Sequence, residues 1–127
     1  MPEARVGVTF WPLALASGLS FMPFTSITRI AERQIFAGIR GRYMHGERMT
    51  AGDVALDAET DIPIHQHPHE QLTYLLEGRM EFIVGEEKHL MQPGDIAIIP
   101  GGVLHGGRTI TRCRVIDTFA PARDDYR

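Results

Sequence analysis

The regular spacing of turn residues after residue 52 limits the fold of this sequence more than any other feature. Short apolar segments alternate with links that contain Gly and Pro; residues 96–99, Ile-Ala-Ile-Ile, lie between Pro93-Gly94-Asp95 and Pro100-Gly101-Gly102. In the first link, Pro presets φ and the following Gly tolerates positive φ, as a type II turn requires. Short strands with a turn about every eight to twelve residues are typical of a sandwich or barrel. The sequence therefore predicts an all-β protein.

The same pattern gives the expected strands and the domain organisation. We expect one or two short strands between residues 30 and 49, a hairpin turn at residues 85–87, and strands at 54–56, 62–67, 71–76, 80–84, 88–92, 96–99 and about 112–119. Residues 121 onward are predicted to be a polar tail. We divide the chain into an N-terminal arm, 1–28, and one barrel domain, 29–127.

Size and composition fit a single globular domain. The chain has 127 residues, of which 43% are hydrophobic and 23% charged, and its formal net charge is −3. This charge gives no basic footprint, so we expect no nucleic-acid partner. The single cysteine, Cys113, cannot form an intrachain disulfide. A reducing compartment is compatible with that composition, and we expect a cytoplasmic location.

The N-terminal arm contains an apolar stretch at residues 10–24. Its Ala14-Leu15-Ala16 imitates a signal-peptidase site, but Arg5 is the lone preceding cation and Pro12 interrupts the stretch. The stretch is too short and too interrupted to span a bilayer, so we expect no membrane segment. We interpret it as an arm that packs on the barrel or on a partner subunit. A native start at Met22 is the alternative.

Three histidines and one glutamine have the spacing of a metal site. His65 and His67 lie two residues apart on an expected strand, so their side chains point to the same face. Gln71 begins the next strand, and His105 arrives from a distant segment. Three imidazoles and an amide oxygen suit one divalent first-row ion, namely nickel, iron, manganese, cobalt or zinc. A histidine-rich surface patch that collects metal adventitiously is the alternative.

Two separated motifs carry a resemblance to the cupin superfamily. They read His65-x-His67-x3-Gln71-x6-Gly78 and Gly94-x5-Pro100-x-Gly102-x2-His105. The resemblance covers about residues 50–119 and implies a double-stranded β-helix, or jelly-roll, barrel with the metal inside. This chain has Gln71 and Thr109 where the family usually has Glu and often Asn.

The neutral Gln71 ligand bears on the chemistry of the site. It leaves the site at a formal charge of +2, which makes the ion a stronger Lewis acid and favours hydrolytic, isomerase or lyase chemistry over oxygenation. Glu70 is a rival ligand that strand alternation should direct away from the metal.

The last expected strand carries candidate substrate residues. Alternation places Val115, Asp117 and Phe119 on one face. If that face lines the barrel, Asp117 is a carboxylate in an apolar cavity, which is costly unless it is paired or catalytic. The opposite register, with Asp117 in solvent, is equally compatible with the pattern. Arg123 either folds back over the barrel mouth or remains a solvated tail charge.

A narrower resemblance rests on residues 67–71, His-Pro-His-Glu-Gln, and on residues 116–126. Both segments resemble the small cupins of pectin and alginate breakdown, which open 4,5-unsaturated uronate monosaccharides to linear keto sugars. The resemblance implies a carboxylated sugar as substrate, a homodimer, and substrate roles for Asp117, Phe119 and Arg123, beside a metal held by His65, His67, Gln71 and His105.

Two other functions remain open at this point. One is a metal-dependent oxygenase or lyase that acts on another small acid, and the other is a non-catalytic cupin that binds a ligand. His69 is expected to be a surface residue or to support the ligands from behind. His45 and His89 receive no role.

Overall fold

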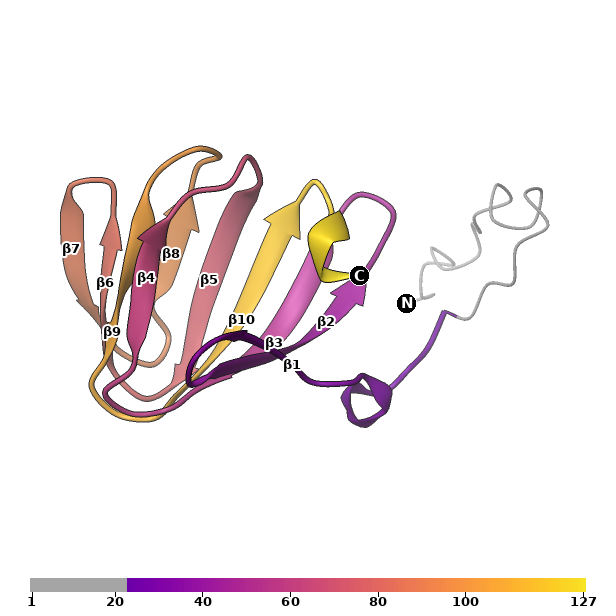
Figure 1. Ribbon diagram of the computed structural model, residues 1–127, viewed down its shortest axis with the longest axis horizontal. Coiled ribbons are helices and arrows are strands. Elements are labelled where there is room, and N and C mark those ends of the chain that lie inside the picture. Colours follow the sequence, from indigo (N-terminus) through magenta and orange to yellow (C-terminus); the bar gives the residue numbers. More distant parts are fainter. Residues whose placement is uncertain (1–22) are drawn as a thin grey trace, which may run out of the picture.

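The computed structural model describes residues 23–127, which form two antiparallel β-sheets and two short 3-10 helices. Figure 1 shows the strands side by side in a curved array. The strands are β1 (Arg33–Phe36), β2 (Ile39–His45), β3 (Thr50–Leu56), β4 (Asp61–His65), β5 (Glu70–Glu77), β6 (Met80–Val84), β7 (Glu87–Met91), β8 (Ile96–Ile99), β9 (His105–Thr109) and β10 (Cys113–Ala120). The helices are η2 (Ile27–Arg29) and η3 (Asp124–Tyr126).

The chain alternates between the two sheets. One sheet has the order β1-β2-β3-β10-β5-β8 and the other has the order β4-β9-β6-β7. After β3 the chain crosses to β4, returns to β5, crosses again to β6 and β7, and returns once more for β8. Repeated crossing between two antiparallel sheets is the connectivity of a jelly roll. The predicted all-β jelly-roll barrel is confirmed.

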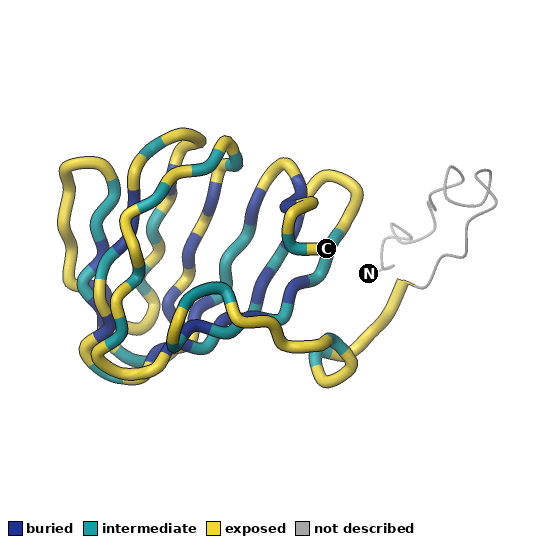
Figure 2. The backbone as a smooth tube through the Cα atoms, viewed as in Figure 1, coloured by how far each residue is buried: buried dark blue, intermediate teal, exposed yellow. Residues whose placement is uncertain are grey.

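The core lies between the sheets and follows strand alternation. Along β3, buried residues alternate with partly exposed ones, and β5 shows the same period of two. Figure 2 shows this as alternating colours along both strands. Leu75 of β5 and Ile99 of β8 are completely buried, and Met80 and Phe82 of β6 meet them from the second sheet.

Most expected strands are present, but the structure differs from the prediction at β4 and β9. The segment at 62–67 ends as a strand at His65, so His67 lies in the following link. Strand β9 is absent from the expected strands, and its sequence contains Gly106-Gly107, a pair that is unusual inside a strand. Here glycine permits close packing: a Cβ on Gly106 would lie 2.6 Å from the carbonyl oxygen of Ile62 in β4.

The turn at residues 93–95 has the predicted conformation, whereas the predicted start of β3 is wrong. Gly94 has a φ of +97°, and the Asp95 N–H donates to the Gln92 carbonyl at 2.9 Å. These features match the type II turn that Pro93-Gly94-Asp95 predicts. Strand β3, in contrast, begins at Thr50, four residues before the expected strand.

The two ends of the chain differ from expectation in different ways. The predicted polar tail after Pro121 folds back on the barrel, and both Ala122 and Arg123 are buried. At the other end, η2 is tied to the outer face of β2, where Arg42 donates to the carbonyl of Ile30 at 2.9 Å. The apolar stretch, the signal-like sequence and the alternative start at Met22 lie wholly or mostly outside the described residues. Within residues 23–127, no helix has the length and hydrophobicity needed to cross a membrane.

Candidate metal centre

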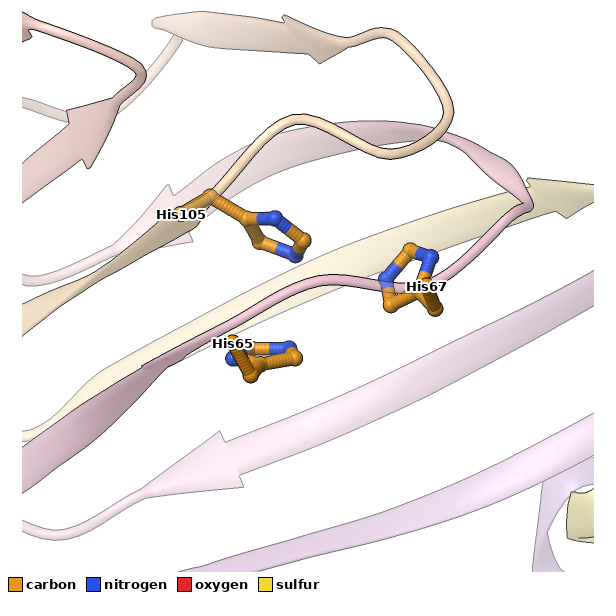
Figure 3. Close-up of side chains that lie close together, drawn as sticks. All are labelled: His65, His67 and His105. Atoms are coloured by element: carbon orange, nitrogen blue, oxygen red, sulfur yellow. The ribbon is translucent and has the colours of Figure 1, made fainter.

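Three histidine side chains converge inside the barrel. His65 ends β4 and is paired in register with His105, which begins β9. His67 reaches the same point from the link between β4 and β5. One ring nitrogen of each residue lies within 4.8 Å of the others, and the centroids of the His65 and His105 rings are 4.3 Å apart. Figure 3 shows the three rings around one common space.

Backbone carbonyls fix the orientation of all three rings. The Nδ1 atoms of His65, His67 and His105 lie 2.7, 3.1 and 2.8 Å from the carbonyl oxygens of Pro63, His69 and Val103. A neutral imidazole that donates from Nδ1 keeps its lone pair on Nε2. Such hydrogen bonds behind the ligand are characteristic of histidines that bind metals. The three Nε2 atoms are therefore prepared to act as ligands.

Burial favours the neutral form of two of these imidazoles. Desolvation lowers the pKa of His105 to about 4, and it is also the main cause of the lowered pKa of His67, with Arg123 as a further cause. The Nε2 atom of His105 is buried and has no hydrogen-bond partner within residues 23–127. A buried ring nitrogen without a partner is costly unless a ligand completes it.

Gln71 supplies a further donor atom. Its Oε1 lies 2.9 Å from Nε2 of His67, whose Nδ1 already donates to a carbonyl. Two acceptor atoms therefore face each other, an arrangement that a shared cation would stabilise. The donor set fits a divalent transition ion, which is the chemistry that the sequence predicts.

Asp117 faces into the barrel, so the solvent-facing register is wrong. The His65, His105, Gln71 and Asp117 side chains all line one cavity of about 70 Å³. Burial raises the pKa of Asp117 to about 6, whereas hydrogen bonds from Thr73 and Gln71 oppose this rise. A partly buried carboxyl group with a raised pKa beside a set of metal-ligand types is a common active-site arrangement.

Arg123 also lines this cavity, which excludes the solvated-tail alternative. Its guanidinium lies 3.9 Å from the ring centroid of Tyr126 and 4.8 Å from that of Phe119. Its Nε and Nη2 atoms donate to the two carboxylate oxygens of Asp125 at 3.0 and 2.8 Å. Arg123 is thus held rigidly at the wall of the cavity.

Two residues that sequence reasoning overlooked hold the C-terminal segment in place. The buried Thr50 hydroxyl accepts a hydrogen bond from the Arg123 N–H at 2.8 Å and bonds Nδ1 of His45 at 2.9 Å. His45 Nε2 lies 3.2 Å from the carbonyl oxygen of Tyr126. Thr73 was also missed, although alternation from Gln71 places it on the inner face.

The remaining candidates lie outside the centre or support it indirectly. Glu70 is exposed, as alternation predicts for a residue directed away from the site. His69 is partly buried, and its carbonyl orients His67. His89 is exposed beside Asp95. Thr109 is buried but fixes a loop, because its hydroxyl donates to the carbonyl of Asp57 at 2.6 Å.

Comparison with known proteins agrees with this geometry. The model of the cupin domain family matches residues 48–119. The chain belongs to the cupin family. This cupin is 33% identical over 64 residues to the pectin degradation protein KdgF of Dickeya dadantii, a match that covers 49% of this chain and 58% of that protein. It is 29% identical over 92 residues to an uncharacterized protein of Streptomyces coelicolor, covering 72% of this chain and 88% of the other.

Solved structures show the same relationship. The structure of KdgF from a Halomonas species superposes with a TM-score of 0.77 at 28% identity, covering 84% of this chain and all 100% of that one. An RmlC-like cupin from Shewanella frigidimarina has a TM-score of 0.78 at 26% identity, with 84% and 97% coverage. The chain is therefore a cupin that resembles cupins of pectin degradation.

Proposed function

We propose that this cupin is a metal-dependent enzyme that converts 4,5-unsaturated uronate monosaccharides to linear keto sugars. The observation that carries the proposal is the shared cavity, which Asp117 and Arg123 line together with His65 and His105 of the three-histidine cluster. Similarity to KdgF supports the substrate class. The proposed binding partner is therefore a small carboxylated sugar.

The proposed ligands are His65, His67, Gln71 and His105. Their nitrogen and amide oxygen donors suit nickel, iron, manganese, cobalt or zinc. A bound divalent ion would supply Lewis acidity toward an oxygen atom of the substrate. Because all four donors are neutral, they would leave the full positive charge of that ion directed at an anionic substrate.

Asp117 is proposed to carry the proton. Its Oδ1 is engaged by the Thr73 hydroxyl at 2.7 Å and the Gln71 amide at 3.4 Å, whereas Oδ2 accepts no hydrogen bond from residues 23–127. Oδ2 would accept the proton of the hemiacetal hydroxyl as the bond between C1 and the ring oxygen breaks. This step leaves an aldehyde at C1 and an enolate at C5. Return of the proton to C4 gives the linear keto sugar, so the reaction is an isomerisation that consumes neither water nor an oxidant.

Arg123 is proposed to bind the substrate carboxylate. Its Nε and Nη2 atoms are engaged by Asp125, and Nη1 is the guanidinium nitrogen that Asp125 does not engage. Nη1 can therefore donate to the substrate while Asp125 keeps the side chain in position. The Phe119 ring faces the Arg123 guanidinium and meets the His67 ring edge to face, and it would form the apolar wall of the site.

The test is turnover of unsaturated galacturonate and guluronate, followed by the loss of their ultraviolet absorbance. We expect the metal-loaded protein to accelerate this loss, and Asp117→Asn to slow it by about 100-fold or more, the usual contribution of a proton carrier. Asp53→Asn is the matched control, because Asp53 of β3 pairs with Arg114 of the neighbouring strand β10 and neither residue lines the cavity. An unchanged rate in Asp117→Asn would exclude the assigned role.

A lyase reaction is the second candidate. The chain is 34% identical over 67 residues to the dimethylsulfoniopropionate lyase DddQ of Ruegeria pomeroyi, a match that covers 52% of this chain and 33% of that protein. Dimethylsulfoniopropionate therefore belongs in the same substrate panel. Release of dimethyl sulfide without uronate turnover would favour this candidate over the isomerase.

A homodimer is proposed on the basis of an apolar patch on the outer face of β5 and β8. Leu72 and Tyr74 of β5 lie opposite Ile98 and Ile96 of β8, and the two isoleucines are 63% and 55% exposed. Adjacent exposed apolar side chains of this kind mark interaction surfaces. The mass in solution tests this assignment, and Ile98→Lys is expected to yield monomers.

A further inference from the structure

The inner face of β5 carries a buried hydroxyl between the metal centre and the carboxylate. Thr73 is only 2% exposed, and it lies directly opposite Asp117 in the β5–β10 ladder. Its Oγ1 is 2.7 Å from Oδ1 of Asp117 and 2.9 Å from Nε2 of Gln71. Gln71, two residues earlier, points to the same face and is 7% exposed.

The chemistry of these groups allows one direction for the hydrogen bonds. An ionised carboxylate only accepts, so the Thr73 hydroxyl donates its proton to Asp117. The Thr73 oxygen then accepts, and the group that faces it must be the NH2 of Gln71. The reverse amide orientation would place Oε1 where Nε2 now lies. Oε1 would then face the Thr73 oxygen, whose proton is already donated to Asp117, and it would lie 3.4 Å from the Asp117 carboxylate.

The position of the Gln71 amide oxygen, Oε1, follows from this orientation. With its NH2 directed at Thr73, Gln71 presents Oε1 to the space beside Nε2 of His67, 2.9 Å away. Oε1 is the atom of an amide that binds a cation, whereas the NH2 group would repel it. The hydroxyl of Thr73 therefore determines whether Gln71 is a ligand.

We propose that Thr73 is a positioning residue that, with Asp117, selects a neutral amide oxygen as the fourth metal ligand. Thr73 and Asp117 also disfavour Glu at position 71. A carboxylate oxygen would replace the NH2 group of Gln71, which now donates to the oxygens of Thr73 and Asp117. This inference rests on the metal centre of the proposed function. It does not depend on the identity of the substrate.

Metal affinity tests the role of the hydroxyl. The full chain is stripped with a chelator and titrated with cobalt(II), with heat and the cobalt absorption spectrum as readouts. Thr73→Val keeps the shape of the side chain but removes the hydroxyl, and we expect the dissociation constant to rise by about ten-fold or more, as for other residues that orient ligands. Thr73→Ser is expected to restore both the affinity and the spectrum.

Thr109→Val is the matched control. Thr109 is equally buried, at 1% exposure, but its hydroxyl bonds the 57–60 loop and not a ligand. The Thr109→Val substitution should lower the stability of the protein and leave its cobalt affinity unchanged. Equal cobalt affinity in the Thr73→Val variant and the unmodified chain would overturn the proposal, as would loss of affinity in both valine variants alike. Failure of the unmodified chain to bind cobalt would also overturn it.

The preference for Gln over Glu at position 71 is tested with the metal-stripped protein. We expect Gln71→Glu to lower the denaturation midpoint of the stripped protein, since it brings two carboxylates to one hydroxyl. Adding Asp117→Asn should restore the midpoint, because one carboxylate and one amide are again present. A double variant no more stable than Gln71→Glu would overturn the selection. Absence of uronate turnover alongside these expected results would reject the proposed reaction and leave the assignment of Thr73 standing.

Discussion

The hydroxyl of Thr50 provides a measurable link between stability and the site. Thr50 is 0% exposed and bonds both the Arg123 N–H, at 2.8 Å, and Nδ1 of His45, at 2.9 Å. Thr50→Val keeps the volume of the side chain and leaves both partners without this oxygen. An unsatisfied buried group costs about 1–3 kcal/mol, and partly buried His45 can regain a bond from water. We therefore expect the free energy of unfolding to fall by about 2–3 kcal/mol.

The assay is chemical denaturation together with thermal melting. For a domain of this size, about 1 kcal/mol corresponds to roughly 4 °C, so the melting temperature should fall by about 8–12 °C. Thr118→Val is the matched control: Thr118 lies on β10 with partial exposure, its side chain makes no hydrogen bond to residues 23–127, and we expect a change within about 0.5 kcal/mol. Equal stability of the two variants would refute the reasoning. Release of the Arg123 backbone should also raise KM more than it lowers kcat.

Three further variants test the core, the approach of β9, and the ligand set. Leu75→Ala empties a completely buried position and should lower the free energy of unfolding by about 2–5 kcal/mol in denaturant titrations, with an unchanged melting curve as the contrary result. Gly106→Ala brings a methyl group 2.6 Å from the carbonyl of Ile62, next to His105, so the metal content of the purified protein should drop; full occupancy would contradict this. Glu70→Ala should leave metal content unchanged, because that side chain is exposed, and a loss of metal would restore Glu70 as a rival ligand.

The motif spacing predicted the histidine cluster because its chemistry needs particular residue types at particular separations. Strand alternation could not decide whether Asp117 faces the barrel, since a period of two gives two equivalent registers. The register is decided by β10, which lies between β3 and β5 at the centre of the large sheet. There, Val115 and Phe119 are 3% exposed and bring Asp117 inward with them.

A contact between residues far apart in the sequence explains why the position of Arg123 could not be predicted. Arg123 lies in a locally polar segment, and the hydroxyl that holds it belongs to a residue 73 positions earlier. Neither Thr50 nor His45 has a local pattern that points to this contact. Strand β9 was hidden for a different reason, because Gly106 is needed for close packing against β4 and not for a turn.

Metal analysis of protein purified without a histidine tag tests the central claim most directly. We expect about one divalent transition ion per chain after dialysis, as one set of four donors requires, and we expect its loss in His105→Ala with the fold retained by circular dichroism. A tag-free protein that remains metal-free after incubation with nickel, iron, manganese, cobalt and zinc would contradict the proposed metal centre. Equal metal content in His105→Ala and the unmodified chain would do the same.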